Sequence, residues 1–432
     1  MQTGELLDLD VTDVAHGGVF VARHDGRVVF VADAIPGERV RVQLTDTAKP
    51  AFWRGDVVEV LAASPHRRPH VWAAADVGVA DRPGGADFGH IDLAHQRELK
   101  LRVLLDALER FGGMTQPAAT IEGAPPLLSP AGEIVAQETP DATRWRTRVS
   151  LHVDADGRVG PYAARSHRVV ETDDLPLATA EIEAAADALR AGPPLPAGRI
   201  DLVQPADGRV RVIPRPEARR RPRGPARRPA NDPARETVIE RVGDRAFRVD
   251  AGGFWQVHRL AAPSLSSTAA AMIEGAVDPD AQHLDLYGGV GLFAAAIAGL
   301  GGTRITTVES DPRATAHAGE NLADWVGARA ETDRTDRYLA RLLAQAGGAE
   351  RERLARGVVL LDPPRAGAGR QVVEQVAALR PASVVYVACD PVALARDLGT
   401  FRAQGYEPRR IHALDLFPHS HHVEAVAVLA PA

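Results

Sequence analysis

The chain has 432 residues, of which 45% are hydrophobic and 25% are charged, a mixture typical of a soluble globular protein with two or three domains. The formal net charge of −6 does not indicate a nucleic-acid binder, so any such role has to rest on local features. No apolar run reaches the ~18 residues that span a bilayer, and the opening residues carry no signal-peptide pattern. We therefore expect a cytoplasmic protein that makes no contact with a membrane.

Residues 1–62 predict a small β-barrel of the OB-like kind. Segments rich in β-branched residues alternate with turn signals, and the predicted strands run from Leu6 to Val11, Gly18 to Ala22, Val28 to Val31, Arg39 to Leu44 and Trp53 to Val60. Six Lys and Arg against ten Asp and Glu give this region a charge of −4. It lacks the basic face of a strong RNA binder, and a barrel that only caps the rest of the protein stays an alternative.

The middle of the chain is mixed in character. Residues 91–112 predict a helix, because apolar residues recur at three- and four-residue spacing before Gly112. Residues 145–176 look rich in strands and carry several arginines. Residues 214–233 hold seven arginines and six prolines, which cannot build a core and therefore predict a loop or linker. Its arginines either contact phosphates or are simply solvated.

From about residue 265 the pattern of strand, glycine-rich turn and helix predicts a doubly wound α/β domain with a parallel sheet. Residues 283–293 contain a buried strand and a D-x-Y-G-G-x-G turn, and a helix begins at Ala294. Glycines such as Gly289 let the backbone approach a ligand where open α/β sheets bind nucleotides. A glycine turn alone would also fit a dinucleotide, although the G-x-G-x-x-G pattern is missing.

An acidic residue, Glu309, ends the second strand of this domain, ~20 residues after the glycine turn. A carboxylate there can accept hydrogen bonds from ribose hydroxyls, so the two features together predict an adenosine site. The arrangement resembles class I S-adenosylmethionine-dependent methyltransferases. That class often places a group near the adenine after the next helix, where Asn321, Asp333 and Asp336 lie, and we select Asp336.

Two further predicted strands end in reactive residues at the same sheet edge. Asp362-Pro363-Pro364-Arg365 follows one of them, and its prolines keep the chain extended so that Asp362 and Arg365 project beside the cofactor. The D-P-P-x motif indicates nucleobase methylation but also occurs in amino-methyltransferases. The only cysteine, Cys389, ends the other strand. A single cysteine excludes an intrachain disulfide and a four-cysteine cluster, and its position argues against an inert buried thiol.

A thiol at this position suits methylation of uridine at C5. Attack of a thiolate on C6 makes C5 enolate-like, and a base must remove the C5 proton after the methyl has been transferred. Glu424 is the one carboxylate in an apolar stretch near the C-terminus, and burial should raise its pKa to a useful range. His419, His421 and His422 precede it without zinc-ligand spacing, so we predict no metal site.

These motifs together strongly resemble the bacterial RNA uridine C5-methyltransferase family, which makes 5-methyluridine in tRNA and 23S rRNA. Residues 1–62 look like its TRAM barrel, residues 166–170 match its central domain, and residues 254–258 resemble the entry to its catalytic domain. The resemblance implies Cys389 as nucleophile and Glu424 as proton acceptor. It also implies that the residues around cofactor or base include Gln256, Tyr287, Leu292, Glu309 and Asp362.

Three departures from the family pattern are visible. Many members carry a [4Fe–4S] cluster on four cysteines, but two of the matching positions here are Ala86 and Leu175, so we expect S-adenosyl-L-methionine and no iron–sulfur cluster. The usual Cys-Asn-Pro reads Cys389-Asp390-Pro391, and we expect Asp390 to raise the pKa of the nucleophile. His258 stands where the family has Asn.

The predicted organisation has three parts, and the chain is expected to act as a monomer. They are a barrel over residues 1–62, a central RNA-binding domain over 63–90 and 113–240, and a methyltransferase domain over 91–112 and 241–432. The expected partner is structured tRNA or rRNA with a flipped uridine. The alternatives are an amino-methyltransferase without covalent catalysis and a non-catalytic RNA-binding protein that keeps the fold.

Overall fold

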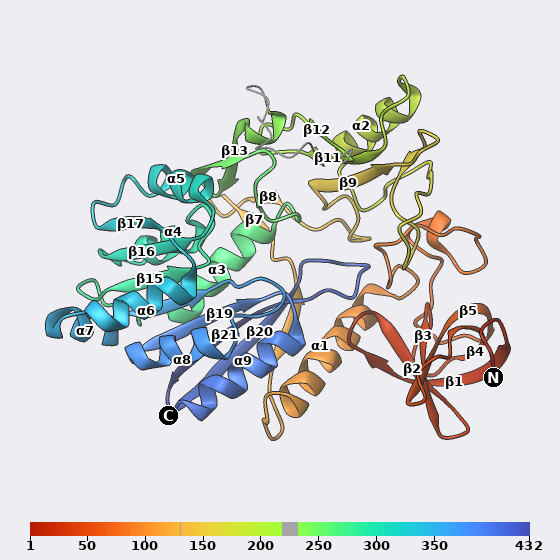
Figure 1. Cartoon of the computed structure of the whole chain (residues 1–432), viewed down its shortest axis with the longest axis horizontal. Helices are drawn as coiled ribbons and strands as arrows, with labels where there is room; N and C mark the ends of the chain where they lie inside the picture. The colour runs from red at the N-terminus through yellow and green to blue at the C-terminus, as the bar shows by residue number, and fades with distance from the viewer. Residues whose placement is uncertain (130, 218–231) are drawn as a thin grey trace, which may run out of the picture.

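The computed structural model describes residues 1–129, 131–217 and 232–432, which form three regions (Figure 1). A β-barrel lies at one side of the molecule, a large α/β sheet lies at the other, and a smaller sheet lies beside both. The predicted fold class, a Rossmann-like domain with an N-terminal barrel and an α+β central region, is confirmed. No helix among the described residues is both long and apolar enough to cross a membrane.

The N-terminal region is a closed barrel with strand order β1-β2-β3-β5-β4. Buried and exposed side chains alternate along β1 and β4, because successive residues of a strand point to opposite faces. Phe20, Val29 and Val42 are fully buried in its apolar interior. All five predicted strands are present, each longer than predicted: β1 Leu6–Ala15, β2 Val19–His24, β3 Arg27–Ala32, β4 Arg39–Asp46 and β5 Phe52–Ala62.

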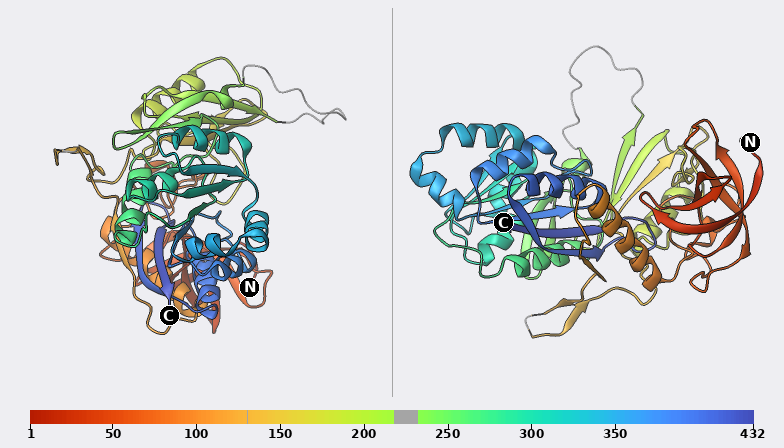
Figure 2. Two further views of the ribbon diagram at one scale, coloured as in Figure 1. Left: turned by 90° about the vertical axis from the view of Figure 1, so that its left-hand side faces the viewer. Right: turned by 90° about the horizontal axis from the view of Figure 1, so that it is seen from below.

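Helix α1 (Leu93–Arg110) connects the barrel to the large sheet. It begins at Asp92, whose carboxylate accepts a hydrogen bond from the His95 backbone N at 2.9 Å. Leu99 packs into the barrel core, whereas Leu104 and Leu108 pack into a core of the large sheet. Figure 2 shows the helix between the two regions in its right-hand view. Because one helix contributes to both cores, the barrel is held against the large sheet rather than merely tethered to it.

The central region is built on a four-stranded antiparallel sheet of order β10-β9-β11-β12 with helix α2 against it. Residues 145–176 contain less strand than predicted, because most of that range forms turns and isolated bridges. The loop predicted over 214–233 is wrong at its start, because residues 214–216 end strand β12, and six of the seven arginines in that range lie outside the described residues. The elements are β9 Arg148–Val153, β10 Val159–Gly160, α2 Ala180–Ala191, β11 Gly198–Val203 and β12 Arg211–Pro216.

The large sheet has eight strands in the order β17-β16-β15-β18-β19-β21-β20-β6. The first five are parallel, as predicted, but β21 is antiparallel to both β19 and β20. The connection from β20 to β21 is too short for a crossover, so the two strands form a hairpin. The strands are β6 Thr120–Gly123, β15 His283–Leu286, β16 Ile305–Glu309, β17 Ala328–Thr332, β18 Val358–Leu361, β19 Ser383–Ala388, β20 Tyr406–Asp415 and β21 Glu424–Pro431.

Two apolar layers cover this sheet. One contains residues of α1, α6, α8 and α9, and the other contains residues of α3 and α4 together with the hairpin β13-β14. The helices are α3 Ala261–Ile273, α4 Leu292–Gly299, α5 Pro312–Asn321, α6 Thr335–Gln345, α7 Gly348–Ala355, α8 Arg370–Leu379 and α9 Pro391–Ala403. Two hairpins complete the fold, β7 Leu127–Leu128 with β8 Ile134–Ala136, and β13 Thr237–Val242 with β14 Arg245–Asp250.

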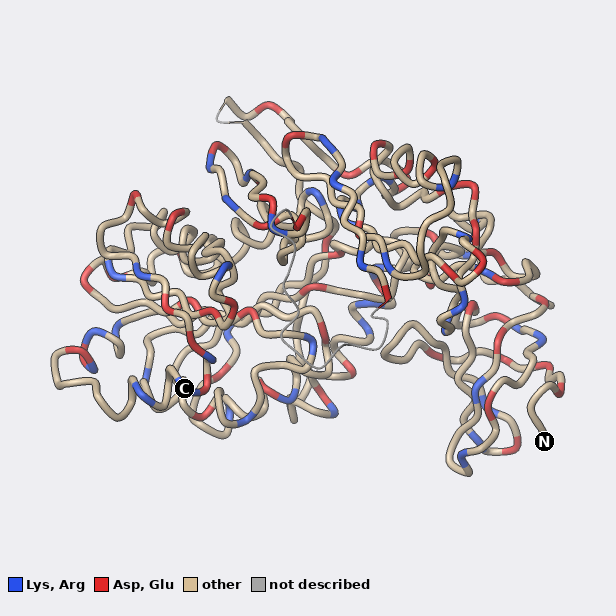
Figure 3. The backbone as a smooth tube through the Cα atoms, turned by 45° about the horizontal axis from the view of Figure 1, so that its top comes forward, with Lys and Arg blue, Asp and Glu red and all other residues tan. Residues whose placement is uncertain are grey.

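Acidic and basic residues are interspersed along the backbone (Figure 3). Many pair locally, as where Arg41 of the barrel donates hydrogen bonds to both Asp8 and Glu59. The field that a polyanion would meet is therefore set by particular arginines rather than by the net charge.

Candidate active site

A cavity of about 1100 Å³ lies at the carboxyl edge of the large sheet and brings most of the predicted site residues together. Parallel strands end at the same edge, so residues that are distant in sequence meet there. The predicted residues that line the cavity are Gln256, Tyr287, Gly289, Glu309, Asp336, Asp362, Cys389 and Glu424. Leu292 does not line it. Its side chain is 8% exposed and packs in the core beneath α4, so the structure does not place it with the others.

The turn after β15 is shaped by its backbone conformation. Tyr287, Gly289 and Gly291 all have positive φ, of 62°, 55° and 89°. A Cβ on Gly288 would lie 1.9 Å from the Thr307 hydroxyl, so only glycine lets the turn pack against β16. No atom lies within 4 Å of the position a Cβ would take on Gly289, which leaves that backbone open to a ligand.

Glu309 is held in place by backbone N–H groups. One of its oxygens accepts hydrogen bonds from the N–H of Ser310 at 2.6 Å and of Asp311 at 2.8 Å, and the other accepts one from Gly289 at 3.2 Å. These contacts couple the carboxylate to the glycine turn and fix its orientation. A fixed carboxylate beside an open backbone is the arrangement expected for binding a ribose.

The three residues proposed from the sequence as the group beside the cofactor's adenine have different surroundings in the structure. Asn321 is buried, and its amide bonds to backbone groups of Arg248 and Val290, so it supports the fold. Asp333 forms an ion pair with Arg341 and does not line the cavity. Asp336 lines the cavity, and Arg334 holds its carboxylate through two hydrogen bonds of 3.0 and 3.1 Å.

Asp285 of β15, Asp362 after β18 and Glu424 at the start of β21 form an acidic cluster. Burial raises the pKa of Asp362 to about 7, and the charge of Asp285 adds to this shift. Burial likewise raises the pKa of Glu424 to about 8, with Asp362 raising it further and Arg365 opposing. Neither Asp362 nor Glu424 has a side-chain hydrogen bond within the described part of the chain, so both carboxylates can serve a ligand in the cavity.

Cys389 stands between β19 and α9, partly exposed to the cavity. Burial raises the pKa of its thiol to about 12, the charges of Glu424 and Asp362 raise it, and Arg365 lowers it. The neighbouring Asp390 is not among these main causes. Its carboxylate is instead turned toward the start of α9 and toward His16 of the barrel, which accounts for its small effect on the thiol.

Comparison with known proteins agrees with this geometry. The TRAM domain family matches residues 1–58, and the family described as tRNA (Uracil-5-)-methyltransferase matches residues 266–431. An uncharacterized RNA methyltransferase of Streptomyces avermitilis is 38% identical over 99% of both chains. The chain belongs to the RNA uridine C5-methyltransferase family. A relative from Streptomyces coelicolor is 37% identical over 99% of this chain and 93% of its own.

A solved structure shares the fold. The tRNA (uracil-54, C5)-methyltransferase of Pyrococcus abyssi, crystallised with S-adenosyl-L-homocysteine, superposes with a TM-score of 0.66 at 19% identity, over 98% of this chain and 100% of its own. The enzyme described here is an S-adenosyl-L-methionine-dependent RNA methyltransferase. Its cavity fits that cofactor, because Gly289 offers open backbone, Glu309 a fixed acceptor, and Asp362 a carboxylate for a cationic group.

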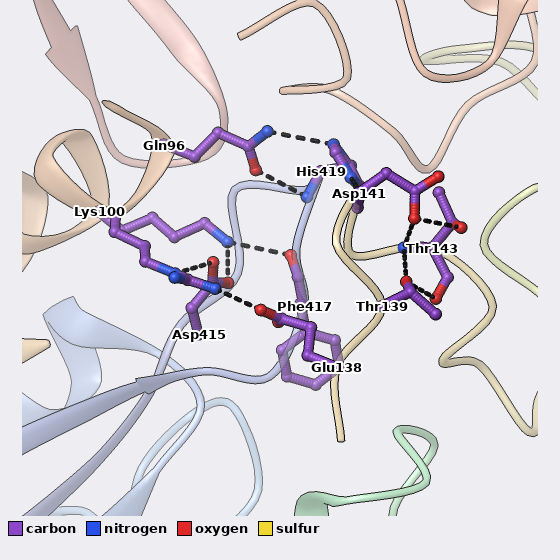
Figure 4. A network of polar contacts seen from close by, with 10 residues as sticks. Gln96, Lys100, Glu138, Thr139, Asp141, Thr143, Asp415, Phe417 and His419 are labelled. Atoms are coloured by element: carbon purple, nitrogen blue, oxygen red, sulfur yellow. Dashed lines mark hydrogen bonds and ion pairs between the residues drawn. The ribbon is translucent and has the colours of Figure 1, made fainter. Parts of the chain in front are cut away.

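The loop that leads to Glu424 is anchored by a buried polar network (Figure 4). The Lys100 ammonium of α1 donates to Asp415 at 2.5 Å and to the Phe417 carbonyl at 3.0 Å. The Gln96 oxygen accepts from the His419 backbone N at 2.8 Å, and the His419 ring bonds to the Asp141 carbonyl at 2.7 Å. The base candidate is thus positioned by the helix that also packs against the barrel.

The histidines before Glu424 each have a protein partner. His419 belongs to this network, His421 contacts Asp87 at 2.6 Å, and His422 contacts Arg365 at 3.3 Å. No group of three or more potential metal ligands occurs among the described residues.

The departures at Ala86, Leu175 and His258 all lie in packed interiors. Ala86 and Leu175 share one apolar cluster with Trp72. His258 is buried, stacks on Trp145 at 5.3 Å between ring centroids, and its Nδ1 accepts from the Leu260 N–H. Burial lowers the pKa of His258 to about 3, so its ring is neutral and supports the fold.

Sequence reasoning missed Arg146 and His16. Arg146 lines the cavity without a carboxylate partner among the described residues, and burial and the charge of Arg365 lower its pKa. His16 reaches Asp390 from the barrel. Neither carried a local signal, because each comes near the site only through the packing of separate regions.

Proposed function

We propose that this enzyme methylates C5 of a uridine in tRNA or rRNA through a covalent bond between Cys389 and C6 of the base. The observation that carries the proposal is that Cys389 and Glu424 line the same cavity as the glycine turn and Asp362. A thiol, a carboxylate base and a methyl-donor site in one cavity are what C5 methylation requires.

The chain's own groups would divide the chemistry as follows. Cys389 adds to C6, which places negative charge on C5 and O4, and S-adenosyl-L-methionine supplies the electrophilic methyl group to C5. Glu424 then accepts the C5 proton. The electrons of that C–H bond restore the C5–C6 double bond while the sulfur–C6 bond breaks, which releases 5-methyluridine and a thiolate.

The pKa values suit these roles. Glu424, with a pKa near 8, is a stronger base than an exposed carboxylate and still ionises in part at neutral pH. Cys389, with a pKa near 12, is a thiol at neutral pH and must lose its proton when the base arrives. Its high pKa makes the resulting thiolate strongly nucleophilic.

The cavity also carries groups suited to RNA. Phe254 lines it with 74% of its surface exposed and can stack on a nucleobase. Arg146 and Arg365 line it without carboxylate partners in the described ranges and can contact phosphate or base oxygens. We further infer that the barrel and the central region, the part of residues 63–90 and 113–240 that lies outside the large sheet, hold the RNA while the target base leaves its stack.

The test is a trapping experiment with RNA that contains 5-fluorouridine. Fluorine cannot leave as a proton, so the enzyme should form an adduct that survives denaturing electrophoresis in the presence of S-adenosyl-L-methionine. Cys389→Ala should form none. Glu424→Gln should accumulate an adduct with ordinary uridine RNA, because the C5 proton has no acceptor.

Two controls distinguish the alternatives. An amino-methyltransferase would leave Cys389→Ser active in transfer of labelled methyl groups to RNA, and nucleoside mass spectrometry would then find no 5-methyluridine. A non-catalytic RNA-binding protein would show no binding of S-adenosyl-L-methionine by calorimetry. Either result would overturn the proposal.

A further inference from the structure

A second cavity, of about 130 Å³, adjoins the cofactor cavity at Cys389. Cys389, Arg365 and His422 line both cavities and therefore form the wall between them. Residues of the barrel close the second cavity, and polar and apolar groups share its lining. The other lining residues are Ala15, His16, Gly17, Gly18, Phe88, Lys100, Val103, Asp390, Pro391 and His421.

His16 and Asp390 form a contact across this cavity, between the barrel and the turn that carries the nucleophile. His16 Nε2 lies 2.9 Å from Asp390 Oδ2, and Asp390 Oδ1 accepts from the Ala393 backbone N at 2.8 Å. The carboxylate is thus fixed by the start of α9 and in turn holds the imidazole. The hydrogen bond that His16 donates to the Asp390 carboxylate raises the pKa of His16, which makes the imidazole a better proton acceptor.

The covalent mechanism needs an acceptor for the thiol proton of Cys389. Glu424 cannot be that acceptor and also accept the C5 proton in the same turnover unless it loses the first proton in between. A separate acceptor removes this conflict. It must be able to receive a proton from the sulfur, hold that proton near neutral pH and release it to bulk solvent.

Other groups at the second cavity meet these conditions less well than His16. Burial and the charges of His421 and Arg365 lower the pKa of His422 to about 3, so it is a weak base. Lys100 is committed to Asp415 and Phe417. His421 contacts Asp87 as His16 contacts Asp390, but the His421 side chain is only 25% exposed. The His16 side chain is 46% exposed, so it can pass a proton to solvent.

We propose that water in the second cavity carries the thiol proton of Cys389 to His16, so that the barrel supplies a relay residue for the nucleophile. The inference rests on the covalent role of Cys389 proposed above. A cavity of 130 Å³ holds about four waters at ~30 Å³ each, and the polar side chains in its lining can orient them.

Each proton that the relay moves has a donor and an acceptor. The S–H bond breaks as the S–C6 bond forms, and the imidazole of His16 becomes imidazolium. When elimination later regenerates the thiolate, His16 returns the proton to sulfur, and the C5 proton leaves from Glu424. The charged and titratable groups facing Cys389 and His16 are Asp362, Arg365, Asp390, Glu424, His421, His422 and Lys100.

The test uses the fact that Cys389 is the only cysteine in the chain. Alkylation by iodoacetamide is followed by intact-mass spectrometry on the full-length protein, without RNA or cofactor, from about pH 6 to about pH 11. The variant is His16→Gln, and the matched control is His24→Gln, a barrel histidine that does not line the second cavity.

In the native protein the alkylation rate should rise through a first inflection set by His16 and again as the thiol itself ionises. His16→Gln should lose the first inflection, react roughly 10²-fold more slowly near neutral pH, and converge with the native rate near pH 11. His24→Gln should match the native profile. A His16→Gln profile that coincides with the native one, or lies below it by the same factor at every pH, would overturn the relay.

A second variant guards against a local packing defect. Asp390→Asn keeps a residue that can cap α9 but removes the charge beside His16, so the first inflection should move to lower pH. An unmoved inflection would contradict the role of Asp390. Since alkylation requires neither RNA nor methyl transfer, failure of the relay is distinguishable from failure of the proposed function, which trapping with 5-fluorouridine RNA measures.

Discussion

Replacing Glu424 with glutamine should stabilise the folded protein, and the gain should grow with pH. The Glu424 side chain is 6% exposed, and burial beside Asp362 raises its pKa from 4.5 to about 8. Between these two pH values the folded state keeps the proton while the unfolded chain has lost it. The free energy of unfolding of the native protein therefore falls as pH rises through this window, and the fall is complete above about pH 8. Glutamine has no proton to lose.

The size of this stability difference follows from the shift in the pKa of Glu424. A change from 4.5 to about 8 spans ~3.5 units, and each unit corresponds to about 1.36 kcal/mol. Between about pH 4.5 and pH 8 the free energy of unfolding of the variant should rise by about 4 to 5 kcal/mol relative to that of the native protein. Of this rise, ~3 kcal/mol should be present by pH 7. For a domain of this size that corresponds to a relative rise in Tm on the order of 10 °C.

Scanning calorimetry at about pH 5, 7 and 8.5 measures the difference in Tm between the variant and the native protein. The control is Glu331→Gln, which neutralises an exposed carboxylate on β17 and should leave the difference constant. A Glu424→Gln difference that does not change with pH would show that Glu424 ionises in the folded protein as it does in the unfolded chain. The reasoning from burial to base strength would then be wrong.

Three other predictions concern the cofactor, the RNA and the loop. Glu309→Ala should weaken binding of S-adenosyl-L-methionine, measured by calorimetry, by about 10- to 100-fold, because two ribose hydrogen bonds are lost; unchanged affinity would place the ribose elsewhere. Phe254→Ala should raise KM for RNA by roughly 5- to 150-fold, the equivalent of about 1 to 3 kcal/mol of lost stacking, and should leave cofactor affinity unchanged. An equal weakening of RNA and cofactor binding would indicate misfolding. Lys100→Met should cost up to about 3 to 5 kcal/mol of stability, because the buried Asp415 loses its nearer partner and keeps only Arg97, at 3.4 Å. The double variant Lys100→Met/Asp415→Leu should recover part of this loss, and a double variant no more stable than the single one would contradict the pairing.

Local patterns predicted the elements well. Alternation of β-branched residues and turns located all five barrel strands, and apolar spacing located α1 to within two residues at each end. The antiparallel β21 was not predicted, because a buried apolar strand looks the same in either direction. The strand content of residues 145–176 was overestimated, because arginine- and valine-rich segments also form turns when no neighbouring strand pairs with them.

The glycine turn, the carboxylate at the end of β16 and the cysteine at the end of β19 were readable from the sequence, because a strand followed by a turn places its last residues at one sheet edge wherever the domain folds. The raised pKa of Glu424 was also predicted from burial, but the charges that raise the pKa of Cys389 were not, because only the folded structure brings Glu424 and Asp362, rather than Asp390, to bear on the thiol. Nor was the contact of His16 with Asp390, 374 positions apart, since it exists only because α1 packs the barrel against the sheet.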